Sequence, residues 1–291
     1  MIGYLKKTFF ISIGIFLFSL LVFGNLESPI TSGREIHSYD MVFRADPGVE
    51  TALKDAGFTI LSLANNHTPN FGAQGLRDTF QYLRSAEIQY VGAGENDTEA
   101  YAPVFVEKNG MTFAFFAYND TDVAPDGYSA AENHHGTAFM NIDRMKKAVS
   151  NVDAQVDFVI VSMHSGKEYV AEPNISQTEF AHAAIDSGAD LIIGHHPHVV
   201  QTAEKYQGKY IFYSLGNFVF DQMWSNETRL GLAVKFIFRI GEGISDISFL
   251  PVLIEDYARP TLLSGDAALA VLKRLGFPAF EKRSMMVSVR D

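Results

Sequence analysis

Phe158–His164 has the sequence FVIVSMH, an apolar run that ends on an imidazole. A run of this kind, without polar alternation, predicts a buried strand over Asp157–Met163. Helical spacing predicts one helix before it at Ile142–Val152 and another after it at Gln177–Ser187, closed by Gly188. This alternation of helix and strand predicts an α/β fold in layers.

Outward from this segment, the same reasoning predicts the remaining elements. Further strands are expected at Phe58–Leu63, Ile88–Val91, Val104–Val106, Met111–Tyr118, Asp190–Ile193 and Tyr210–Leu215. Further helices are expected at Pro47–Gly57, Gly75–Ala86 and Ala267–Leu275. The extended pattern of Leu230–Ile254 suggests a second sheet. No linker or repeat interrupts residues 24–291, which we therefore expect to form one catalytic-type domain.

The bulk composition excludes some classes of function. The chain has 291 residues, 47% of them hydrophobic, which is enough for a full core. Its net charge of -11 argues against a nucleic-acid binder, which needs clustered Lys and Arg. It has no cysteine, so disulfides and thiolate zinc sites are excluded. The absence of cysteine fits an exported bacterial protein, although cytosolic proteins can also lack it.

The amino terminus predicts export or anchoring in a membrane. Lys6 and Lys7 precede an uncharged, apolar run from Thr8 to Leu26. This order fits a signal sequence or a signal anchor over residues 1–23, with its positive end inside. No small-x-small cleavage site follows, which favours an anchor. The run is borderline in length for a spanning helix, and a buried helix or strand is the alternative.

Three segments place a metal-ligand residue directly after a predicted strand. They are Asn65-Asn66-His67, His164 and Gly194–His198 (GHHPH), and they hold five of the nine histidines. Metal hydrolases with layered α/β folds collect their ligands from loops at the carboxyl ends of strands. On an extended segment, residues two apart point the same way, so His196 and His198 can converge while His195 faces elsewhere. A solvated polar loop is the alternative.

The other candidate residues are less specific. An asparagine oxygen in Asn65-Asn66-His67 can be a neutral ligand, and a histidine just outside the ligands can protonate a leaving group. A helix cap or a turn is the alternative for these asparagines. Asn25-Leu26-Glu27 offers one carboxylate, a weak signal by itself. Glu168 and Tyr169 suit contacts to ligands or substrate, or a solvated loop.

Several stretches together resemble a known family. They are Gly24–Pro29 (GNLESP), Phe43–Pro47 (FRADP), Ser62–His67 (SLANNH), Val91–Gly94 (VGAG), Gly194–His198 and Tyr213–Asp221 (YSLGNFVFD). The resemblance is to the bacterial capsule synthesis protein CapA/PgsA family, associated with poly-γ-glutamate capsules. It covers the chain from about Phe23 onward. It implies a calcineurin-like metallophosphatase fold, in which helices flank a two-sheet β-sandwich in four layers (αββα).

The resemblance also implies roles for individual residues. The metal ligands would be Glu27, Asn66, His164, His196 and His198. His67 would be the catalytic acid. Beyond what the resemblance implies, we expect Asn65, His195, Glu168 and Asn217 to bind substrate. The site would hold one or two divalent ions, for which Mn, Fe or Zn would suit the mixed nitrogen and oxygen ligands, and would activate a bound water.

The chain departs from the family pattern at two places. The family begins its domain with a strand that ends in Gly-Asp, whose aspartate is a principal ligand. Here the apolar run leads directly into Gly24–Glu27, and Leu20–Phe23 would be the buried strand that feeds this motif. We therefore expect that the chain lacks the first strand and one metal ligand. Ser165 stands where the family usually has tryptophan.

These observations lead to one expected function and two alternatives. The expected function is that of an extracytoplasmic protein, held at the cell membrane or secreted, which serves synthesis, export or attachment of an anionic capsule polymer such as poly-γ-glutamate. Its metal site would be impaired by the missing aspartate. One alternative is a non-catalytic scaffold or polymer-binding subunit of a membrane synthase complex. The other is a metal-dependent phosphoesterase or peptide-bond hydrolase unrelated to capsule.

Overall fold

The computed structural model describes residues 20–36 and 41–276. Most of the predicted anchor, residues 1–19, lies outside the described residues. Within the described ranges, we find no helix with both the length and the apolar character that a bilayer crossing requires.

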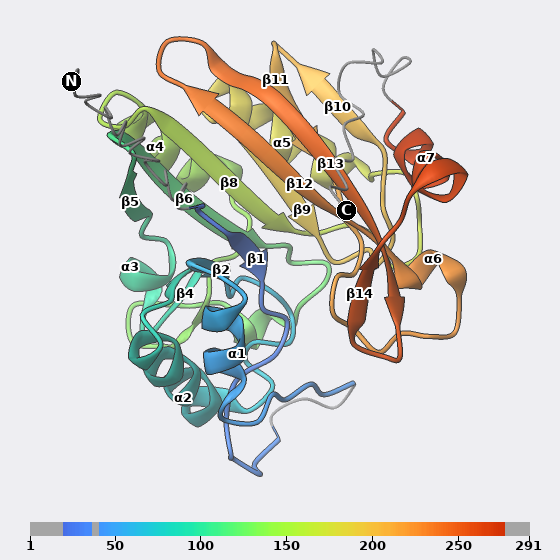
Figure 1. Ribbon diagram of the computed structural model, residues 1–291. Coiled ribbons are helices and arrows are strands. Elements are labelled where there is room, and N and C mark those ends of the chain that lie inside the picture. The colour runs from blue at the N-terminus through green and yellow to red at the C-terminus, as the bar shows by residue number, and fades with distance from the viewer. Residues whose placement is uncertain (1–19, 37–40, 277–291) are drawn as a thin grey trace, which may run out of the picture.

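A six-stranded sheet is the centre of the fold (Figure 1). Its order is β10 (Ala203–Tyr206), β11 (Lys209–Phe212), β9 (Leu191–His195), β8 (Phe158–His164), β6 (Met111–Asn119) and β5 (Val104–Lys108). The four inner strands run parallel, and β5 and β10 are antiparallel at the edges. All residues of β8 are buried, as its apolar run predicts.

Helices cover one face of this sheet. They are α4 (Ile142–Asp153) and α5 (Ile175–Asp186), both close to the predicted boundaries. Met145 and Val149 of α4 and Phe180 of α5 pack against Val159 and Val161 of β8 in one buried cluster. The α4 helix begins at Asn141, whose side chain accepts a hydrogen bond from the Arg144 backbone, a typical amino cap.

The opposite face packs against a second layer made of two smaller sheets. One is parallel and has the order β1 (Phe23–Asn25), β2 (Ile60–Ser62) and β3 (Gln89–Val91). The other is antiparallel and has the order β12 (Leu230–Arg239), β13 (Gly243–Glu255) and β14 (Arg259–Leu262). Both contribute to the same apolar core as the inner face of the large sheet. The predicted second sheet over Leu230–Ile254 is confirmed.

The fourth layer lies outside β1–β3. It contains α1 (Val49–Asp55) and α2 (Gly72–Ser85), whose apolar side chains pack on Leu61 of β2, while the neighbouring Ile60 faces the inner core. The helix α7 (Gly265–Arg274) packs its Val271 and Leu272 into the inner core beside β12 and β13. Short elements complete the described chain: β4 (Ala93–Gly94), α3 (Asp97–Ala100), a 3-10 turn at Asp126–Tyr128, β7 (Gly136–Thr137) and α6 (Asn226–Arg229).

This arrangement confirms the predicted α/β sandwich of two β-layers flanked by helices. Leu20–Phe23 was expected as the buried strand that leads into Gly24–Glu27, but the strand found there, β1, is Phe23–Asn25 and is half-buried. β1 is at an edge of its sheet, with β2 as its neighbour. The missing strand remains a prediction. The domain range of residues 24–291 also remains a prediction.

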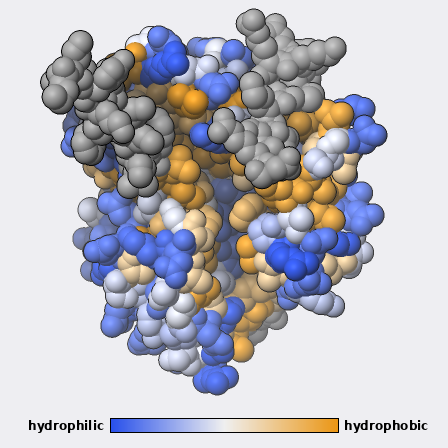
Figure 2. Space-filling view, viewed as in Figure 1, coloured by the Kyte–Doolittle hydropathy of each residue, from blue (hydrophilic) through white to orange (hydrophobic). Residues whose placement is uncertain are grey.

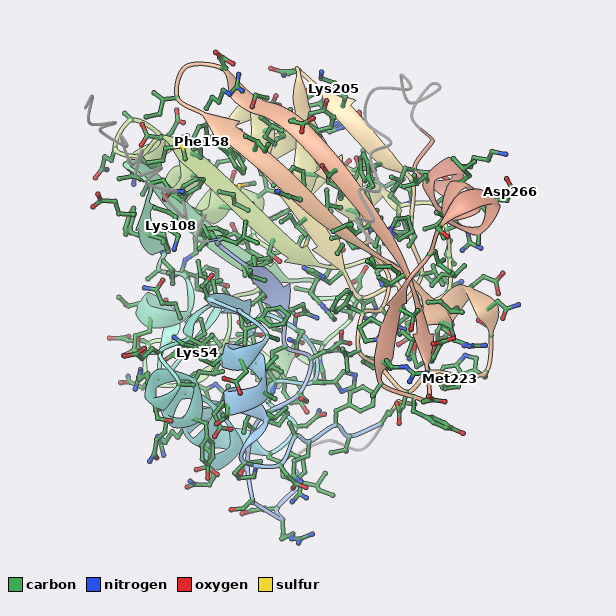
Figure 3. All side chains as sticks on the ribbon, in the orientation of Figure 1. Lys54, Lys108, Phe158, Lys205, Met223 and Asp266 are labelled. Atoms are coloured by element: carbon green, nitrogen blue, oxygen red, sulfur yellow. The ribbon has the colours of Figure 1, made fainter. Side chains whose placement is uncertain are left out.

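The parallel strands bring the predicted site residues to one end of the sandwich. His164 ends β8 and His195 ends β9, while Phe158 is at the opposite end of β8 (Figure 3). Asn25 ends β1 in the other layer, and β2 leads into Asn65-Asn66-His67. Because the carboxyl ends of these strands meet, residues far apart in sequence can share one site.

Candidate metal centre

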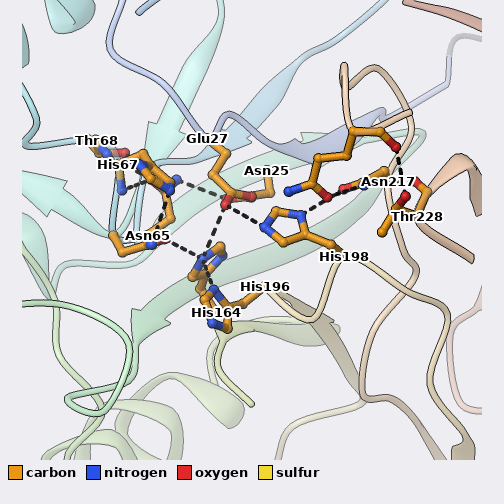
Figure 4. Close-up of polar contacts among 12 residues, drawn as sticks. Asn25, Glu27, Asn65, His67, Thr68, His164, His196, His198, Asn217 and Thr228 are labelled. Atoms are coloured by element: carbon orange, nitrogen blue, oxygen red, sulfur yellow. Dashed lines mark hydrogen bonds and ion pairs between the residues drawn. The ribbon is translucent and has the colours of Figure 1, made fainter. Parts of the chain in front are cut away.

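A carboxylate and three imidazoles meet between the two β-layers (Figure 4). One ligand atom each from Glu27, His164 and His196 lie within 4.8 Å of one another. Glu27 Oε1 is 3.7 Å from His164 Nε2 and 3.7 Å from His198 Nε2. We call these four residues the cluster. The predicted convergence of distant histidines on one place is thus present in the structure.

Asn66 and His67 stand next to the cluster in the order that the resemblance implies. Asn66 Oδ1 is 2.9 Å from His164 Nε2, so its amide oxygen lies among the candidate ligands. Asn66 Nδ2 is 3.2 Å from His67 Nε2. His67 therefore lies outside the set of candidate ligands, behind Asn66, where a residue that transfers a proton to or from the substrate is expected.

Burial sets the charge of the cluster. The histidines are almost inaccessible, with His164 1% exposed. Burial, and then the neighbouring histidines, hold the pKa of His164 well below its ordinary value, and lower the pKa of His196 to about 3. Burial also lowers the pKa of His198. All three imidazoles are therefore neutral at pH 7, the form that binds metals.

Glu27 has the opposite shift. Burial, and then the charge of Glu168, raise its pKa from 4.5 to about 8, against the hydrogen bond from Asn25. Without a cation, Glu27 therefore keeps a proton at neutral pH. Its Oε1 is buried and has no hydrogen-bond partner in the part of the chain that the structure describes. A buried carboxylate oxygen that faces neutral imidazoles fits a divalent cation as the missing partner.

Asn217 fixes the orientation of the His198 ring. His198 Nδ1 is 2.9 Å from Asn217 Oδ1, and Asn217 Nδ2 donates to the Thr228 carbonyl at 2.9 Å. This assigns the proton to His198 Nδ1 and leaves Nε2 free to face Glu27. Asn217 was predicted to bind substrate, but its 7% exposure and its partners place it as a support for His198.

His67 and Glu27 are also held by asparagine side chains, which were not expected from the sequence. His67 Nδ1 is 3.0 Å from Asn70 Oδ1, which also accepts from the Phe43 backbone. Asn25 Nδ2 donates to Glu27 Oε2 at 3.0 Å. Asn70 stands three residues after His67 in a turn, which is the one signal in the sequence that points to it.

The other predicted substrate residues lie in different environments. Asn65 is fully buried, its Nδ2 donates to Asn25 Oδ1 and the Leu26 carbonyl, and its Oδ1 accepts three hydrogen bonds from residues 67 and 68. Its geometry favours a role in shaping the loop. His195 faces the inner core, with its ring 6.3 Å from Phe23. Glu168 is exposed, and its charge acts on Glu27 and His198.

The backbone of the GHHPH segment corrects one sequence argument. An extended segment was expected to orient His196 and His198 alike. Instead, φ is 97° at His196 and 58° at His198, so both residues have left-handed conformations. The rings still converge, with centroids 6.0 Å apart. Positive φ at two non-glycine residues is costly, and is typical of sites whose surroundings fix the backbone for function.

Asp120 supports the segment after His164. Ser165, where the family usually has tryptophan, is fully buried and donates a short hydrogen bond to Asp120 Oδ2. Ser176 donates to the same oxygen at 2.9 Å. The Asp120 backbone N–H donates to the His164 carbonyl at 2.9 Å. These contacts hold the end of β8 in place.

Aromatic side chains surround the cluster on its outer side. Ring centroids of Tyr169 and Phe220 are 6.2 and 5.0 Å from that of His198, and Phe43 is 4.1 Å from His67. A fourth ring, Trp224, is 6.2 Å from Tyr169. We call Phe43, Tyr169, Phe220 and Trp224 the aromatic collar. Figure 2 shows a hollow in the surface between β1–β3 and β12–β14, with apolar residues on both sides of it.

Comparison with known proteins gives a consistent family. The family described as bacterial capsule synthesis protein PGA_cap matches residues 18–222. The capsule biosynthesis protein CapA of Bacillus anthracis is 37% identical over 243 residues, which cover 81% of this chain and 58% of that protein. The PGA biosynthesis protein CapA of Bacillus subtilis is 36% identical over 237 residues, which cover 80% and 62%. The chain thus spans about three-fifths of the length of these relatives.

A solved structure is more distantly similar. The calcineurin-like phosphoesterase YfkN of Bacillus subtilis aligns with a TM-score of 0.49 and 13% identity, over 78% of this chain and 72% of that chain.

Proposed function

Because this chain belongs to the bacterial capsule synthesis protein family, we propose that it takes part in the biosynthesis of a capsule polymer of the poly-γ-glutamate type. The two relatives are named for capsule and PGA biosynthesis and match about four-fifths of the chain. Synthesis, export and attachment of the polymer are all compatible with this role.

Within that role we assign the cluster to binding a divalent metal. The observation that carries this assignment is Glu27 Oε1, which is buried, has no hydrogen-bond partner within residues 20–36 and 41–276, and faces His164 and His198 at 3.7 Å each. His196 and the Asn66 oxygen complete the set. Mixed nitrogen and oxygen donors suit Mn, Fe or Zn. A bound ion would supply Lewis acidity and a water of lowered pKa for hydrolysis of an ester or amide.

His67 is arranged to exchange a proton with a substrate beside the cluster. Burial lowers its pKa to about 4, so the ring is neutral at pH 7. With its proton on Nδ1 toward Asn70, Nε2 begins as an acceptor. The predicted role as an acid therefore needs an anionic substrate close by, because a nearby negative charge raises an imidazole pKa.

The polymer is an unusual ligand for so acidic a protein. With a net charge of -11, the chain offers no general attraction to an anionic polymer, and Lys54, Lys108 and Lys205 lie at the periphery (Figure 3). In the proposed function, the metal supplies the positive charge at the site. The aromatic collar suits the methylene and amide portions of a polyglutamate chain rather than its carboxylates.

We further propose that the domain works outside the cytoplasmic membrane, anchored or released at its apolar amino-terminal segment, next to the subunits of a membrane synthase. Lys6 and Lys7 before the uncharged run, and the absence of cysteine, support this placement. The test is protease treatment of intact cells. Degradation of the domain without lysis is expected, and complete protection would refute it.

Metal binding and capsule formation test the proposal together. Purified wild-type protein should carry a divalent metal, and the double variant His196→Ala with His198→Ala should carry none. In cells that need this protein for capsule, wild type should restore the polymer and the double variant should not. Equal, near-zero metal in both proteins would refute the metal assignment.

The scaffold alternative has one observation in its favour. The cluster has a single carboxylate, Glu27, among the described residues, whereas the family pattern expects an aspartate as well. If the double variant restores capsule as well as wild type does, the protein acts as a non-catalytic scaffold or polymer-binding subunit. Metal-dependent phosphodiester turnover that disappears with His67→Ala, without any effect on capsule, would favour a hydrolase unrelated to capsule.

A further inference from the structure

Two imidazoles at the site, His198 and His67, share a pattern at Nδ1, whereas His196 places its Nδ1 3.2 Å from His164 Nε2. His198 and His67 each place Nδ1 against an asparagine oxygen, at 2.9 and 3.0 Å. Both amides are fixed in orientation, because Asn217 Nδ2 donates to a carbonyl and Asn70 Oδ1 accepts a backbone N–H. In each case Nδ1 carries the proton and Nε2 faces the site.

His164 breaks this pattern. Its Nε2 points into the cluster, but its Nδ1 is buried and has no partner among residues 20–36 and 41–276. A buried polar atom left unpaired costs about 1–3 kcal/mol. Metal-binding histidines almost always donate their second N–H to an acceptor, so a partner is expected here.

An asparagine with the same deficit lies beside His164. Asn119 ends β6, is 0% exposed, and has no partner in the described chain for either Oδ1 or Nδ2. Asn119 and His164 are Cα partners in the parallel β6–β8 ladder. Neighbouring strands are about 4.8 Å apart, so the two side chains start side by side.

Strand alternation places both side chains on the same face. Phe115 and Ala117 of β6 and Ile160 of β8 belong to the core between the two β-layers. Asn119 lies two residues after Ala117, and His164 lies four residues after Ile160. Because side chains alternate along a strand, both face the space between the two β-layers. Tyr118, between Ala117 and Asn119, packs on the helix side instead.

We propose that Asn119 is the positioning residue for His164: its Oδ1 accepts the His164 Nδ1–H when the cluster binds its metal. A rotation of the Asn119 side chain, or one bridging water, closes the contact. The hydrogen bond fixes the tautomer whose Nε2 lone pair faces the ion, and it holds the plane of the ring. This inference rests on the metal binding proposed above, and it gives His164 the same support that Asn217 gives His198.

His195 is the rival partner. It is the Cα partner of His164 on β9, and its Nε2 is also buried without a partner in the described residues. An amide oxygen can only accept, whereas an imidazole nitrogen accepts in one tautomer only. The two supports already present in the structure both use asparagine. Asn119 is therefore the better candidate, and His195→Phe separates the two.

The experiment measures the Zn²⁺ affinity of the metal-free protein by competition with a chelator. Asn119→Leu should bind Zn²⁺ about 10- to 100-fold more weakly than wild type, the range typical for loss of such a support. Asn119→Asp keeps an acceptor and should stay within a few-fold of wild type or bind more tightly. Tyr118→Phe is the matched control, because it removes another buried oxygen that lacks a hydrogen-bond partner in the described part of the chain, but on the helix side, and it should not change the Zn²⁺ affinity.

The outcomes separate this inference from the proposed function. If wild type binds neither Zn²⁺ nor Mn²⁺, the metal assignment fails, and the positioning role fails with it. If wild type binds and Asn119→Leu binds equally well, the positioning role alone is refuted. Loss in His195→Phe without loss in Asn119→Leu would refute it in favour of His195.

Side-chain NMR of Zn²⁺-loaded wild type covers the case in which Asn119→Leu does not fold. The His164 Nδ1–H signal should be present and should exchange slowly with solvent, as expected for a hydrogen-bonded proton. Rapid exchange of this proton would contradict the proposal.

Discussion

Glu27→Gln should make the metal-free protein more stable at neutral pH. The Glu27 side chain is 11% exposed, and burial raises its pKa from 4.5 to about 8. Between these values, the folded protein holds a proton that the unfolded chain has released. The free energy of unfolding of wild type therefore falls as pH rises through this window, by about 1.4 kcal/mol per pH unit. A neutral glutamine avoids this loss.

The expected difference between variant and wild type follows from the two pKa values. It is below about 1 kcal/mol at pH 5 and about 3 kcal/mol in favour of the variant at pH 7. Urea unfolding with a chelator at pH 5, 6, 7 and 8 measures this difference. Glutamine can keep the Asn25 contact through its oxygen, so little else should change.

Metal should reverse the order of stability. At a free metal concentration 1,000 times Kd, wild type gains about 4.1 kcal/mol, more than its deficit of about 3 kcal/mol at pH 7, whereas the variant, which lacks the carboxylate, gains little. A difference between the two proteins that stays constant from pH 5 to 8 would refute the reasoning, because it would show that Glu27 titrates alike in the folded and unfolded chains. Stabilisation of both proteins by metal would show that Glu27 is not a ligand.

Three further predictions follow from the site and its surroundings. Metal binding at pH 7 should release about 0.9 proton, because Glu27 has a pKa of about 8 in the free protein; calorimetry in buffers of different ionisation enthalpy measures it, and no release would contradict the shift. Asn217→Leu should weaken metal binding about 10- to 100-fold by removing the His198 support; chelator competition measures the affinity, and wild-type affinity would contradict it. Gly194→Ala should lower the free energy of unfolding by more than about 2 kcal/mol, because an added Cβ would lie 1.9 Å from the Tyr213 carbonyl oxygen; unchanged urea unfolding would contradict that close approach.

The central strands could be predicted because burial on both faces gives continuous apolar runs, which here have the length of a strand and are rich in β-branched residues. β8 was expected at Asp157–Met163 and is Phe158–His164, and β9 was expected at Asp190–Ile193 and is Leu191–His195. The division of the second layer into two small sheets could not be predicted. It depends on long-range pairing, such as Phe23 beside Ile60, which has no signal in local sequence.

The candidate ligands could be predicted because three separate segments place histidine or asparagine at the ends of predicted strands, and the carboxyl ends of parallel strands meet at one edge of a sheet. Their supports could not. The pairing of Asn217 with His198 joins two loops, and the row formed by Asn119, His164 and His195 depends on strand register. The left-handed conformations at His196 and His198 were also missed, because only the surrounding structure stabilises such angles in non-glycine residues.

The aromatic collar gives this protein a built-in optical reporter. Trp224 is the one tryptophan of the chain, it is 62% exposed, and it adjoins Tyr169, which in turn stacks beside His198. Indole emission from the entire molecule therefore originates at the mouth of the site. Binding of a polymer segment there would change the solvent exposure of the Trp224 ring and hence its emission wavelength. Binding titrations can therefore be followed by fluorescence on unlabelled protein.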